Sequence, residues 1–503
     1  MQYDVAIIGS GLGGLVCGAL LSRNGYRVVI FEKNKQIGGC LQTYARDKAV
    51  IDSGVHYIGG LEEGKNLNKI FSYLGIMDKL RLQRLDVEGF DHIAFGDDPT
   101  TYRQAQGYNN FLQELLKAFP GERRALEEYC HTMKDVCSRF PLYNLRTGSY
   151  GEKLEVLGIN ASTYFEQLTD NERLRNVLAG NNLLYAGVKD KTPFYVHALV
   201  VNSYIEDSWR CVDGGSQIGK WLARAIMEKG GVIYRNTPVK QIIGEGNKVA
   251  HILLEDGRQV SATHYISNLH PHQTLEMTDS DLIRGAYRSR ISGLENAIAP
   301  FMLNIVLKPG AFPYLNYNYY HHQTNDAWAG TDYHKDNWPL TYGLFASASS
   351  RHMPYTDTIS VLTYMRYEEM APWQHTFNTT SVEQPRGADY EAFKKERAEQ
   401  LLDVVAQRFP DLREKIHAYY TATPLSFRDY LGTADGSLYG IQKDYKDTLK
   451  TMIPQRTKLT NLYLTGQNLN LHGILGVTIS AVMTSGEILG LDWLIDQINR
   501  NDI

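Results

Sequence analysis

Cysteine is scarce in this chain, and the few cysteines present do not pair. Five occur among 503 residues, and no two of them form a C-x-x-C spacing. An odd and scattered set excludes a disulfide framework and a structural zinc site, and it is typical of a protein from a reducing compartment. The cysteines are Cys17, Cys40, Cys130, Cys137 and Cys211.

Two further absences narrow the class of protein. Lysine and arginine number 52 against 56 aspartate and glutamate residues, so the basic surplus of a nucleic-acid-binding protein is missing. No run of about 18 apolar residues occurs, which excludes a membrane-spanning helix of ordinary length. The stretch YDVAIIG, residues 3–9, already resembles a strand and leaves no room for a signal peptide, so we expect a cytoplasmic protein.

The sequence also lacks the motifs of two kinds of functional site, a serine nucleophile and a metal site. No G-x-S-x-G elbow follows a predicted strand, which argues against a serine nucleophile. The histidine pair His321 and His322 has no further ligand at helical spacing, so we predict no metal site and expect the pair to face solvent or the core.

Glycine, in contrast, is dense at the start of the chain, where residues 9–39 read GSGLGGLVCGALLSRNGYRVVIFEKNKQIGG. A short apolar run followed by helical apolar spacing predicts a strand, a tight turn and a helix. Gly9 permits the turn, Gly11 lets the backbone approach a pyrophosphate, and Gly14 lets the helix pack close to the sheet. Phosphate groups would then face the N–H groups and the positive dipole end of that helix.

The acidic residue after the next predicted strand supports a dinucleotide site. The strand RVVIFE ends on Glu32, which lies 23 residues beyond Gly9. A carboxylate there accepts hydrogen bonds from ribose hydroxyls and repels a 2′-phosphate, so the pattern disfavours NADP.

A second group of glycines favours FAD over NAD. Gly38 and Gly39 follow the second strand directly, where a nicotinamide-binding domain would continue to its next helix. The stretch VIDSGVHYIGG, residues 50–60, adds three more glycines. The longer flavin nucleotide needs this extra close backbone approach beside its pyrophosphate and ribitol.

Two distant segments are predicted to return to the nucleotide domain. Residues 212–268 contain a helix over about 216–228 and then extended segments with a hairpin turn at 255–257, which fit a β-meander on one face of the sheet. Residues 461–490 give a strand, a small-residue turn and a helix over about 476–489. A helix that begins there aims its N-terminus at the flavin pyrimidine; the alternative is an ordinary strand-loop-helix unit.

The remaining segments have a different character and predict a second domain. Residues 120–140 form an amphipathic pattern typical of core packing, and residues 312–322 are rich in tyrosine. We assign residues 1–85, 205–275 and 455–503 to the nucleotide-binding domain, and 86–204 and 276–454 to a substrate domain laid over it. A cleft would be buried between them.

A second G-x-G-x-x-G is absent from the sequence. A tightly held pyridine nucleotide on a twin domain is therefore not supported. Electrons must enter or leave through the substrate or through an external donor or acceptor.

Several motifs together resemble one family. The motifs are GSGLGGL, IGGCLQT, DSGVHYIGG, HALVVNSYIE, VDGGSQI, GSLYGI and LYLTGQNLNLHGILG. They resemble the FAD-dependent phytoene desaturase and carotenoid isomerase superfamily, most of all its retinol saturase branch. Much of the superfamily has arginine after the glycine pair, whereas Cys40 at this position is similar to the retinol saturase branch. The resemblance extends from end to end, with residues 276–420 matching least.

The resemblance implies an α/β fold: a Rossmann-like FAD-binding domain of the glutathione-reductase and amine-oxidase type with a discontinuous α+β substrate domain. It implies hydride exchange between flavin N5 and a carbon-carbon double bond of an apolar polyene or isoprenoid, and peripheral contact with the inner face of a membrane. Two alternatives stay open: a flavin oxidase or dehydrogenase of the amine-oxidase kind, and a prenyl-lipid carrier of the same fold without flavin. The direction of the redox reaction is not fixed.

Candidate site residues follow from the motifs and from this resemblance. His56 and Tyr57 are the first candidates for a proton donor beside the flavin, and His472 and Tyr439 are comparable. A backbone-bonded histidine and a packed aromatic ring are the alternatives for these positions. His197, Tyr204 and Tyr439 are candidates for substrate contact. The residues expected to bind FAD are Gly9, Gly11, Leu12, Gly13, Gly14, Glu32, Lys33, Gly38, Gly39, Cys40, Leu41, His56, Tyr57, Val239, Asn268, Gly466, Gln467, Gly473, Ile474 and Val477.

Overall fold

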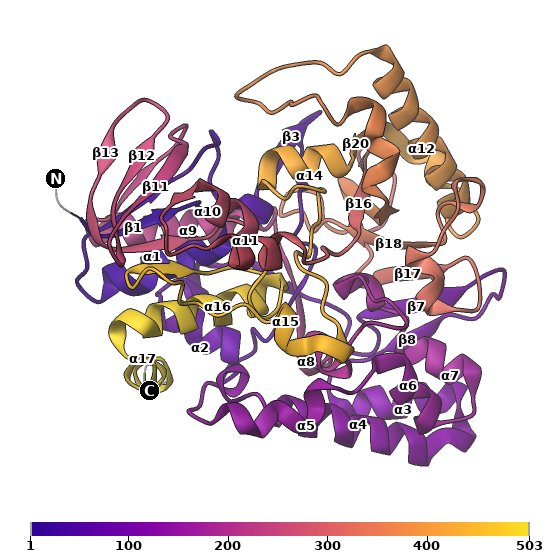
Figure 1. Ribbon diagram of the computed structural model, residues 1–503. Helices are drawn as coiled ribbons and strands as arrows, with labels where there is room; N and C mark the ends of the chain where they lie inside the picture. The colour runs from indigo at the N-terminus through magenta and orange to yellow at the C-terminus, as the bar shows by residue number, and fades with distance from the viewer. Residues whose placement is uncertain (1–2, 501–503) are drawn as a thin grey trace.

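A computed structural model describes residues 3–500 and contains a five-stranded parallel sheet. The strand order is β10-β2-β1-β14-β21. The strands are β1 (Tyr3–Ile8), β2 (Val28–Phe31), β10 (Val232–Tyr234), β14 (Ala262–Ser267) and β21 (Leu462–Leu464). Three segments far apart in the sequence therefore build one sheet, on the left of Figure 1.

Helices cover one face of this sheet and a β-meander covers the other. Helix α1 (Leu12–Arg23) packs between α9 (Ser216–Glu228) and α16 (Gly473–Leu489). The other face carries a four-stranded sheet in the order β13-β12-β11-β15. Its strands are β11 (Val239–Glu245), β12 (Lys248–Leu254), β13 (Gln259–Val260) and β15 (Thr278–Asp279). The predicted meander is thus present, and the apolar residues between the two sheets form a core of their own.

A second large sheet has seven strands in the order β20-β16-β19-β18-β17-β7-β8. The strands are β7 (Asp91–Phe95), β8 (Tyr102–Gln104), β16 (Ala299–Leu307), β17 (Asn318–His322), β18 (Thr341–Ala346), β19 (Thr358–Met365) and β20 (Ile416–Ala422). The tyrosine-rich segment supplies β17, which is buried along its whole length. His321 and His322 therefore lie in the core, and the described residues hold no cluster that could bind a metal ion.

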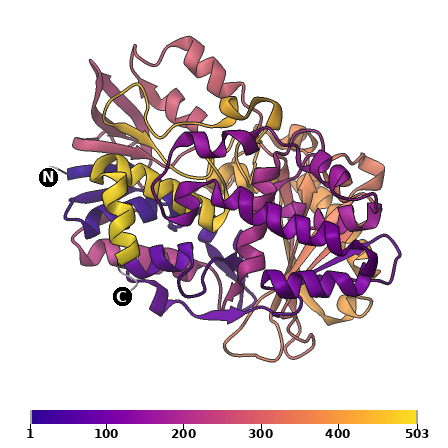
Figure 2. The same cartoon turned by 90° about the horizontal axis from the view of Figure 1, so that it is seen from below.

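Helices between residues 108 and 206 form a layer beside the seven-stranded sheet. Figure 2 shows them packed together across the face seen from below. The amphipathic pattern of residues 120–140 becomes α4 (Arg123–Ser138), and its apolar stripe is buried as predicted. Helix α8 (Phe194–Glu206) packs against α4 and is buried on nearly all sides.

The remaining elements connect these layers. The short strands are β3 (Thr43–Arg46), β4 (Ala49–Asp52), β5 (Ile58–Gly59), β6 (Leu82–Arg84) and β9 (Ser208–Cys211). The helices are α2 (Asn66–Tyr73), α3 (Tyr108–Ala118), α5 (Leu154–Leu157), α6 (Ala161–Leu168), α7 (Glu172–Leu178), α10 (Pro271–Met277), α11 (Gly285–Ser292), α12 (Ala388–Ala406), α13 (Leu412–Lys415), α14 (Pro424–Leu431), α15 (Thr448–Thr451) and α17 (Leu491–Arg500). The strands of the five-stranded sheet come from the segments predicted for the nucleotide-binding domain, and those of the seven-stranded sheet come from the segments predicted for the substrate domain. The domain boundaries themselves stay a prediction.

Over residues 3–500, no single helix has the length and apolar composition needed to cross a membrane. Helices α16 and α17 meet the composition requirement only together, and they are bent by 119° relative to each other.

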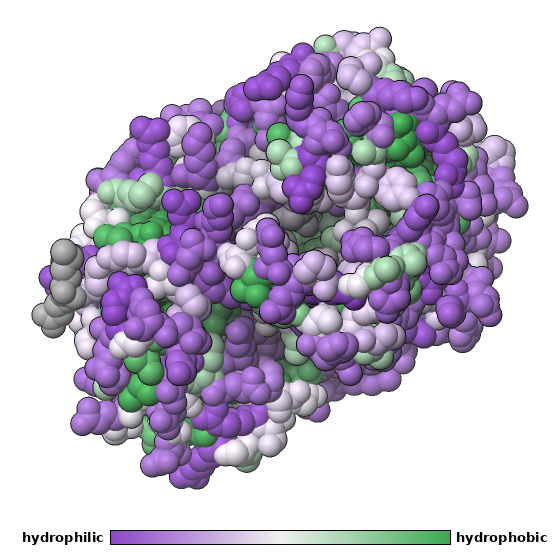
Figure 3. Space-filling view, turned by 90° about the horizontal axis from the view of Figure 1, so that it is seen from above, coloured by the Kyte–Doolittle hydropathy of each residue, from purple (hydrophilic) through white to green (hydrophobic). Residues whose placement is uncertain are grey.

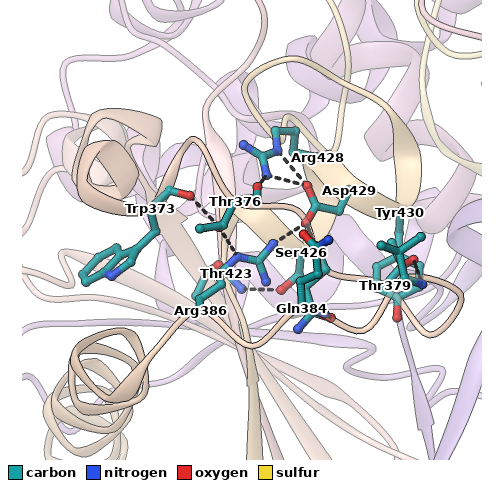
Figure 4. Close-up of polar contacts among 12 residues, drawn as sticks. Trp373, Thr376, Thr379, Gln384, Arg386, Thr423, Ser426, Arg428, Asp429 and Tyr430 are labelled. Carbon is teal, nitrogen blue, oxygen red and sulfur yellow. Dashed lines mark hydrogen bonds and ion pairs between the residues drawn. The ribbon is translucent and has the colours of Figure 1, made fainter.

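A buried ion-pair cluster fastens α14 to a long loop at the top of the molecule. The fully buried Asp429 binds Arg386 and Arg428 (Figure 4). Its carboxylate also accepts a hydrogen bond of 2.8 Å from the Asn378 N–H. On the opposite side, Lys33 Nζ donates to the Asp429 carbonyl at 3.0 Å. This cluster therefore joins the seven-stranded part of the molecule to the end of β2.

The contact between α1 and β1 generates the first prediction. A Cβ atom at Gly14 would lie 2.1 Å from the Gly9 carbonyl oxygen, so Gly14→Ala must push the helix from the strand. We expect a loss of about 2 kcal/mol or more in the free energy of unfolding, measured with urea. Gly285→Ala is the matched control, because that helical glycine has open space around it. A loss below about 0.5 kcal/mol at Gly14 would contradict the account.

Candidate functional site

One cavity of about 470 Å³ runs from the carboxyl ends of the parallel strands to the seven-stranded sheet and α8. Such a place, at the strand ends of an open α/β sheet, is where ligands of this architecture bind. In the space-filling view, the face seen from above is hollowed near its middle, where less hydrophilic residues lie inside a mostly hydrophilic rim (Figure 3).

The first end of the cavity is a cradle of backbone around the start of α1. Gly11 is the N-cap of this helix and no side chain caps it, so the first N–H groups of α1 are free of a side-chain acceptor. A Cβ atom at Gly39, whose φ is +56°, would lie 3.2 Å from the Gly11 Cα. Only glycine keeps the two loops this close while leaving the cavity open to a pyrophosphate.

Asn268 joins this cradle to the loop after β21. Its main-chain N–H donates to the Ile8 carbonyl at 2.9 Å. Its side chain lies so close that a Cβ atom at Gly13 or Gly466 would come within 3 Å of its Oδ1 atom. Asn268 therefore lies where the ends of β1, β14 and β21 meet at the cavity.

Glu32 is buried at the edge of the cradle. Its carboxylate accepts hydrogen bonds from Ser10 Oγ at 2.6 Å, from the Ser10 N–H at 3.0 Å and from the Asn34 N–H at 2.8 Å. These bonds fix the carboxylate at the cavity wall, beside Val239 and Lys33, which also line the cavity. Its contact with a ribose stays a prediction. All charged side chains of the cavity lining lie at this end: Glu32, Lys33 and Glu255.

A second helix begins at the middle of the cavity. Helix α16 has His472 as its N-cap, whose side chain does not cap the helix, and the first residues of α16 line the cavity. Its positive dipole end therefore faces the cavity and can stabilise negative charge on a bound ring. The helix begins at Gly473, earlier than predicted.

The far end of the cavity is an apolar chamber. We define the chamber by lining residues from α8, from the short helix η6 (Asn182–Tyr185), from β18 and β19, and from the loops before α16. They are Leu183, Leu184, Leu199, Val200, Ser203, Tyr204, Phe345, Leu362, Leu438, Tyr439, Leu471 and His472. Among the described residues that line it, none carries a full charge at neutral pH.

Both histidines near the chamber are neutral. Burial lowers the pKa of His56 to about 3, with a further contribution from Arg210, and the imidazole stacks on Phe345 at 4.5 Å. Burial lowers the pKa of His472 to about 4, and its Nε2 lies 2.9 Å from the Leu184 carbonyl. A carbonyl can only accept, so this nitrogen holds the ring proton. Neither residue can act as an imidazolium acid near pH 7.

Tyr57 belongs to a buried hydrogen-bond network that the sequence analysis missed. Its hydroxyl donates to Asp91 Oδ2 at 3.0 Å, so the proton in its 2.7 Å bond with Tyr320 comes from Tyr320. Asp91 is fully buried and also accepts from Asn318 Nδ2 at 2.8 Å. Tyr204 packs against the Tyr57 ring with centroids 4.3 Å apart. The available signal was an aspartate at the start of an apolar strand, FDHIAF.

Most of the predicted site residues line this one cavity. Gly14 and His197 are the exceptions. Gly14 packs against the Gly9 carbonyl, which is the close helix-strand contact expected of the third glycine.

The structure corrects the prediction that His197 contacts the substrate, because His197 does not line the cavity. Its side chain is fully buried, with Nε2 at 2.8 Å from the Tyr129 hydroxyl and Nδ1 at 2.9 Å from the Tyr185 hydroxyl. The motif HALVVNSYIE predicted that His197 lies in or near the cleft. In the structure, α4 and η6 cover this part of α8.

Comparisons with known proteins agree with the site. The profile of a family described as NAD(P)-binding Rossmann-like domain matches residues 7–74. All-trans-retinol 13,14-reductase from Danio rerio is 27% identical over 99% of this chain and 86% of its own length. Chloroplastic prolycopene isomerase from Daucus carota is 23% identical over 98% of this chain and 81% of its own length. The chain is therefore similar over nearly its whole length to both of these proteins.

These full-length similarities confirm the predicted resemblance to the phytoene desaturase and carotenoid isomerase superfamily, including that to the retinol saturase branch. A putrescine oxidase variant has a TM-score of 0.64 with 14% identity, covering 99% of each chain. Identity this low shows a shared fold alone, and it confirms the predicted fold class. The cradle is therefore the site of a flavin or another nucleotide cofactor.

The Asp91 network generates a prediction about pH. Burial raises the pKa of Asp91 from 3.8 to about 7, so the folded protein keeps a proton that the unfolded chain has released. Stability must then fall as pH rises through this interval, by at most about 1.4 kcal/mol per pH unit. We expect Asp91→Asn to remove this part of the decline, measured by urea unfolding between pH 5 and about pH 8.

Asp281→Asn, at an exposed position, controls for the loss of one carboxyl group. Parallel stability-against-pH curves for the wild-type protein and Asp91→Asn would contradict the assignment.

Proposed function

We propose that this protein is an FAD-dependent oxidoreductase that acts on a carbon-carbon double bond of an apolar polyene or isoprenoid chain. The observation that carries the proposal is the division of the cavity. All of the charged lining residues, Glu32, Lys33 and Glu255, lie at the nucleotide end, and the chamber at the other end is apolar and aromatic. A dinucleotide can bind at the first end and a hydrocarbon chain at the second.

The residues present fit FAD. The uncapped start of α1 would supply N–H groups for a pyrophosphate, Glu32 would accept hydrogen bonds from a ribose, and the start of α16 would face the ring. The pair Gly38 and Gly39, both with positive φ, gives the second close backbone approach that the longer nucleotide needs. When bound, FAD supplies hydride exchange with the substrate carbon.

The chamber residues would do three things. Leu183, Leu199 and Leu362 exclude water and position an apolar chain. Tyr204 and Tyr439 line the chamber, and burial raises the pKa of both phenols, so each hydroxyl keeps its proton. Either phenol can therefore supply a proton to the carbon next to the one that receives hydride, whereas the neutral histidines offer no imidazolium. Asp91 holds the Tyr57 hydroxyl in place behind them.

The two alternatives, an amine oxidase and a lipid carrier, have less support than this proposal. A diamine oxidase needs a partner for its second cation, and the described chamber lining has no carboxylate. A lipid carrier has no need for the open cradle at Gly11 and Gly39. The proposal includes an external electron donor or acceptor, and a substrate drawn from a membrane by peripheral contact on its cytoplasmic face.

The function is tested with the purified protein. We expect a yellow protein with a flavin spectrum, and we expect its anaerobically reduced form to be reoxidised by all-trans-retinol or by another member of a panel of retinoids and carotenoids. A colourless protein that cannot be reconstituted with FAD would favour the carrier. Reduction of the oxidised protein by simple amines, with no reoxidation by any polyene, would favour the amine oxidase.

A matched pair of variants tests the cradle. Gly39→Val places a side chain against Gly11 and should weaken FAD binding by about 2 kcal/mol, roughly thirtyfold, measured by titrating FAD into apoprotein. Gly64→Val imposes similar backbone strain at a positive φ with open space around it, so it should leave FAD affinity unchanged. Equal affinities for the two variants would contradict this placement of FAD.

A further inference from the structure

Helix α8 runs along the chamber and then past its end. Tyr204 and Val200, one turn apart, both line the chamber. His197 lies seven residues before Tyr204 and therefore on the same side of the helix, one turn beyond Val200. It does not line the cavity, so the chamber stops between these two turns.

A compact aromatic cluster occupies the position where the chamber stops. We call it the aromatic plug and define it as Tyr129, Phe165, Tyr185, Phe194 and His197. All five side chains are buried, and the His197 ring lies 5.1 Å from Phe165 and 5.6 Å from Phe194 between centroids.

Hydrogen bonds at both ring nitrogens fix the plug. Burial lowers the pKa of His197 to about 3, so the ring is neutral and one nitrogen donates while the other accepts. Tyr129 and Tyr185 are the two partners, and they come from α4 and η6. Three elements are therefore locked together behind the chamber.

The plug is also tied to the cofactor end of the cavity. Leu184, the neighbour of Tyr185, lines the chamber, and its carbonyl binds the N-cap residue of α16, His472. The distance from the start of α16 to the plug is thus set by short, direct contacts.

A second, polar cavity lies close to the plug. Phe165 lies 6.4 Å from Trp328 between ring centroids, and Trp328 lines a cavity of about 1120 Å³. Charged residues of that cavity include Asp190, Lys191 and Asp332. The two cavities share His270 and Gln273 as lining residues, and none of the five plug residues lines either cavity.

We propose that the aromatic plug closes the far end of the substrate chamber and so sets the length of hydrocarbon chain that can lie beside the cofactor. The inference rests on the proposed function and deepens it. The substrate class becomes a chain that enters by one end and stops at the plug, with the reacting double bond at a fixed number of carbons from that end.

The experiment measures chain length directly with a series of unbranched primary alcohols, bound to the purified protein and followed by calorimetry. Each methylene that fits the chamber should tighten binding about fourfold. Beyond a cut-off length, affinity should stop rising. His197→Ala opens the plug and should move the cut-off to longer alcohols, whereas Val200→Phe fills the last open turn of α8 and should move it to shorter ones.

The matched control is His322→Ala. His322 is an equally buried histidine, with Nε2 bonded to the Gly180 carbonyl at 2.8 Å, and it does not line the chamber. Its replacement should lower stability and leave the cut-off where it is. If His197→Ala does not fold, Val200→Phe alone decides, since it leaves the plug intact.

The inference is overturned if the wild-type protein shows no cut-off, or if the folded variants share its cut-off. Because alcohol binding needs neither a redox reaction nor a polyene, its failure is distinct from failure of the proposed function. A protein that no polyene reoxidises can still show the shift in cut-off, and an active saturase can lack it.

Discussion

The close approach of α1 to the end of β1 is the constraint on which the rest of the structure depends. With a hydrogen atom in place of a side chain at Gly14, the helix begins directly over the strand ends, and its first N–H groups face the cavity. The Asn268 amide, the Gly39 turn and the start of α16 then complete the wall around that point. Moving the helix outward would open the wall at every one of these contacts.

The two ends of the cavity differ in polarity: the nucleotide end is charged, and the chamber at the other end is apolar. At the nucleotide end, Glu32 and the N–H groups of α1 are polar and hydrogen-bonded, as a charged ligand requires. In or beside the chamber, His472 and His56 are neutral and the tyrosines keep their protons. An apolar chamber that excludes water strengthens the field of the α16 dipole, because water would screen it.

The sequence predicted those features that depend on short stretches of chain. The glycine turn, Glu32 and the limits of α9 all follow from spacing within about 30 residues, and the structure agrees with each. The start of α16 was predicted less accurately, because its N-cap residue, His472, is not a typical capping residue and makes no side-chain capping bond. The contacts of His197 and Asp91 could not be predicted. The bonds of Asp91 to Tyr57 and Asn318 span 34 and 227 residues, and the bond of His197 to Tyr129 spans 68. Periodicity shows which face of an element is buried but not what covers it.

The most direct test of the central claim, one cavity that joins a nucleotide cradle to a dry apolar chamber, is a crystal structure of the purified protein under xenon pressure. The account predicts a flavin ring beside the start of α16 and xenon atoms among Leu183, Leu199 and Leu362, since apolar cavities stay dry and bind xenon. Ordered water filling the chamber, or a cofactor ring that lies outside the cavity, would contradict it.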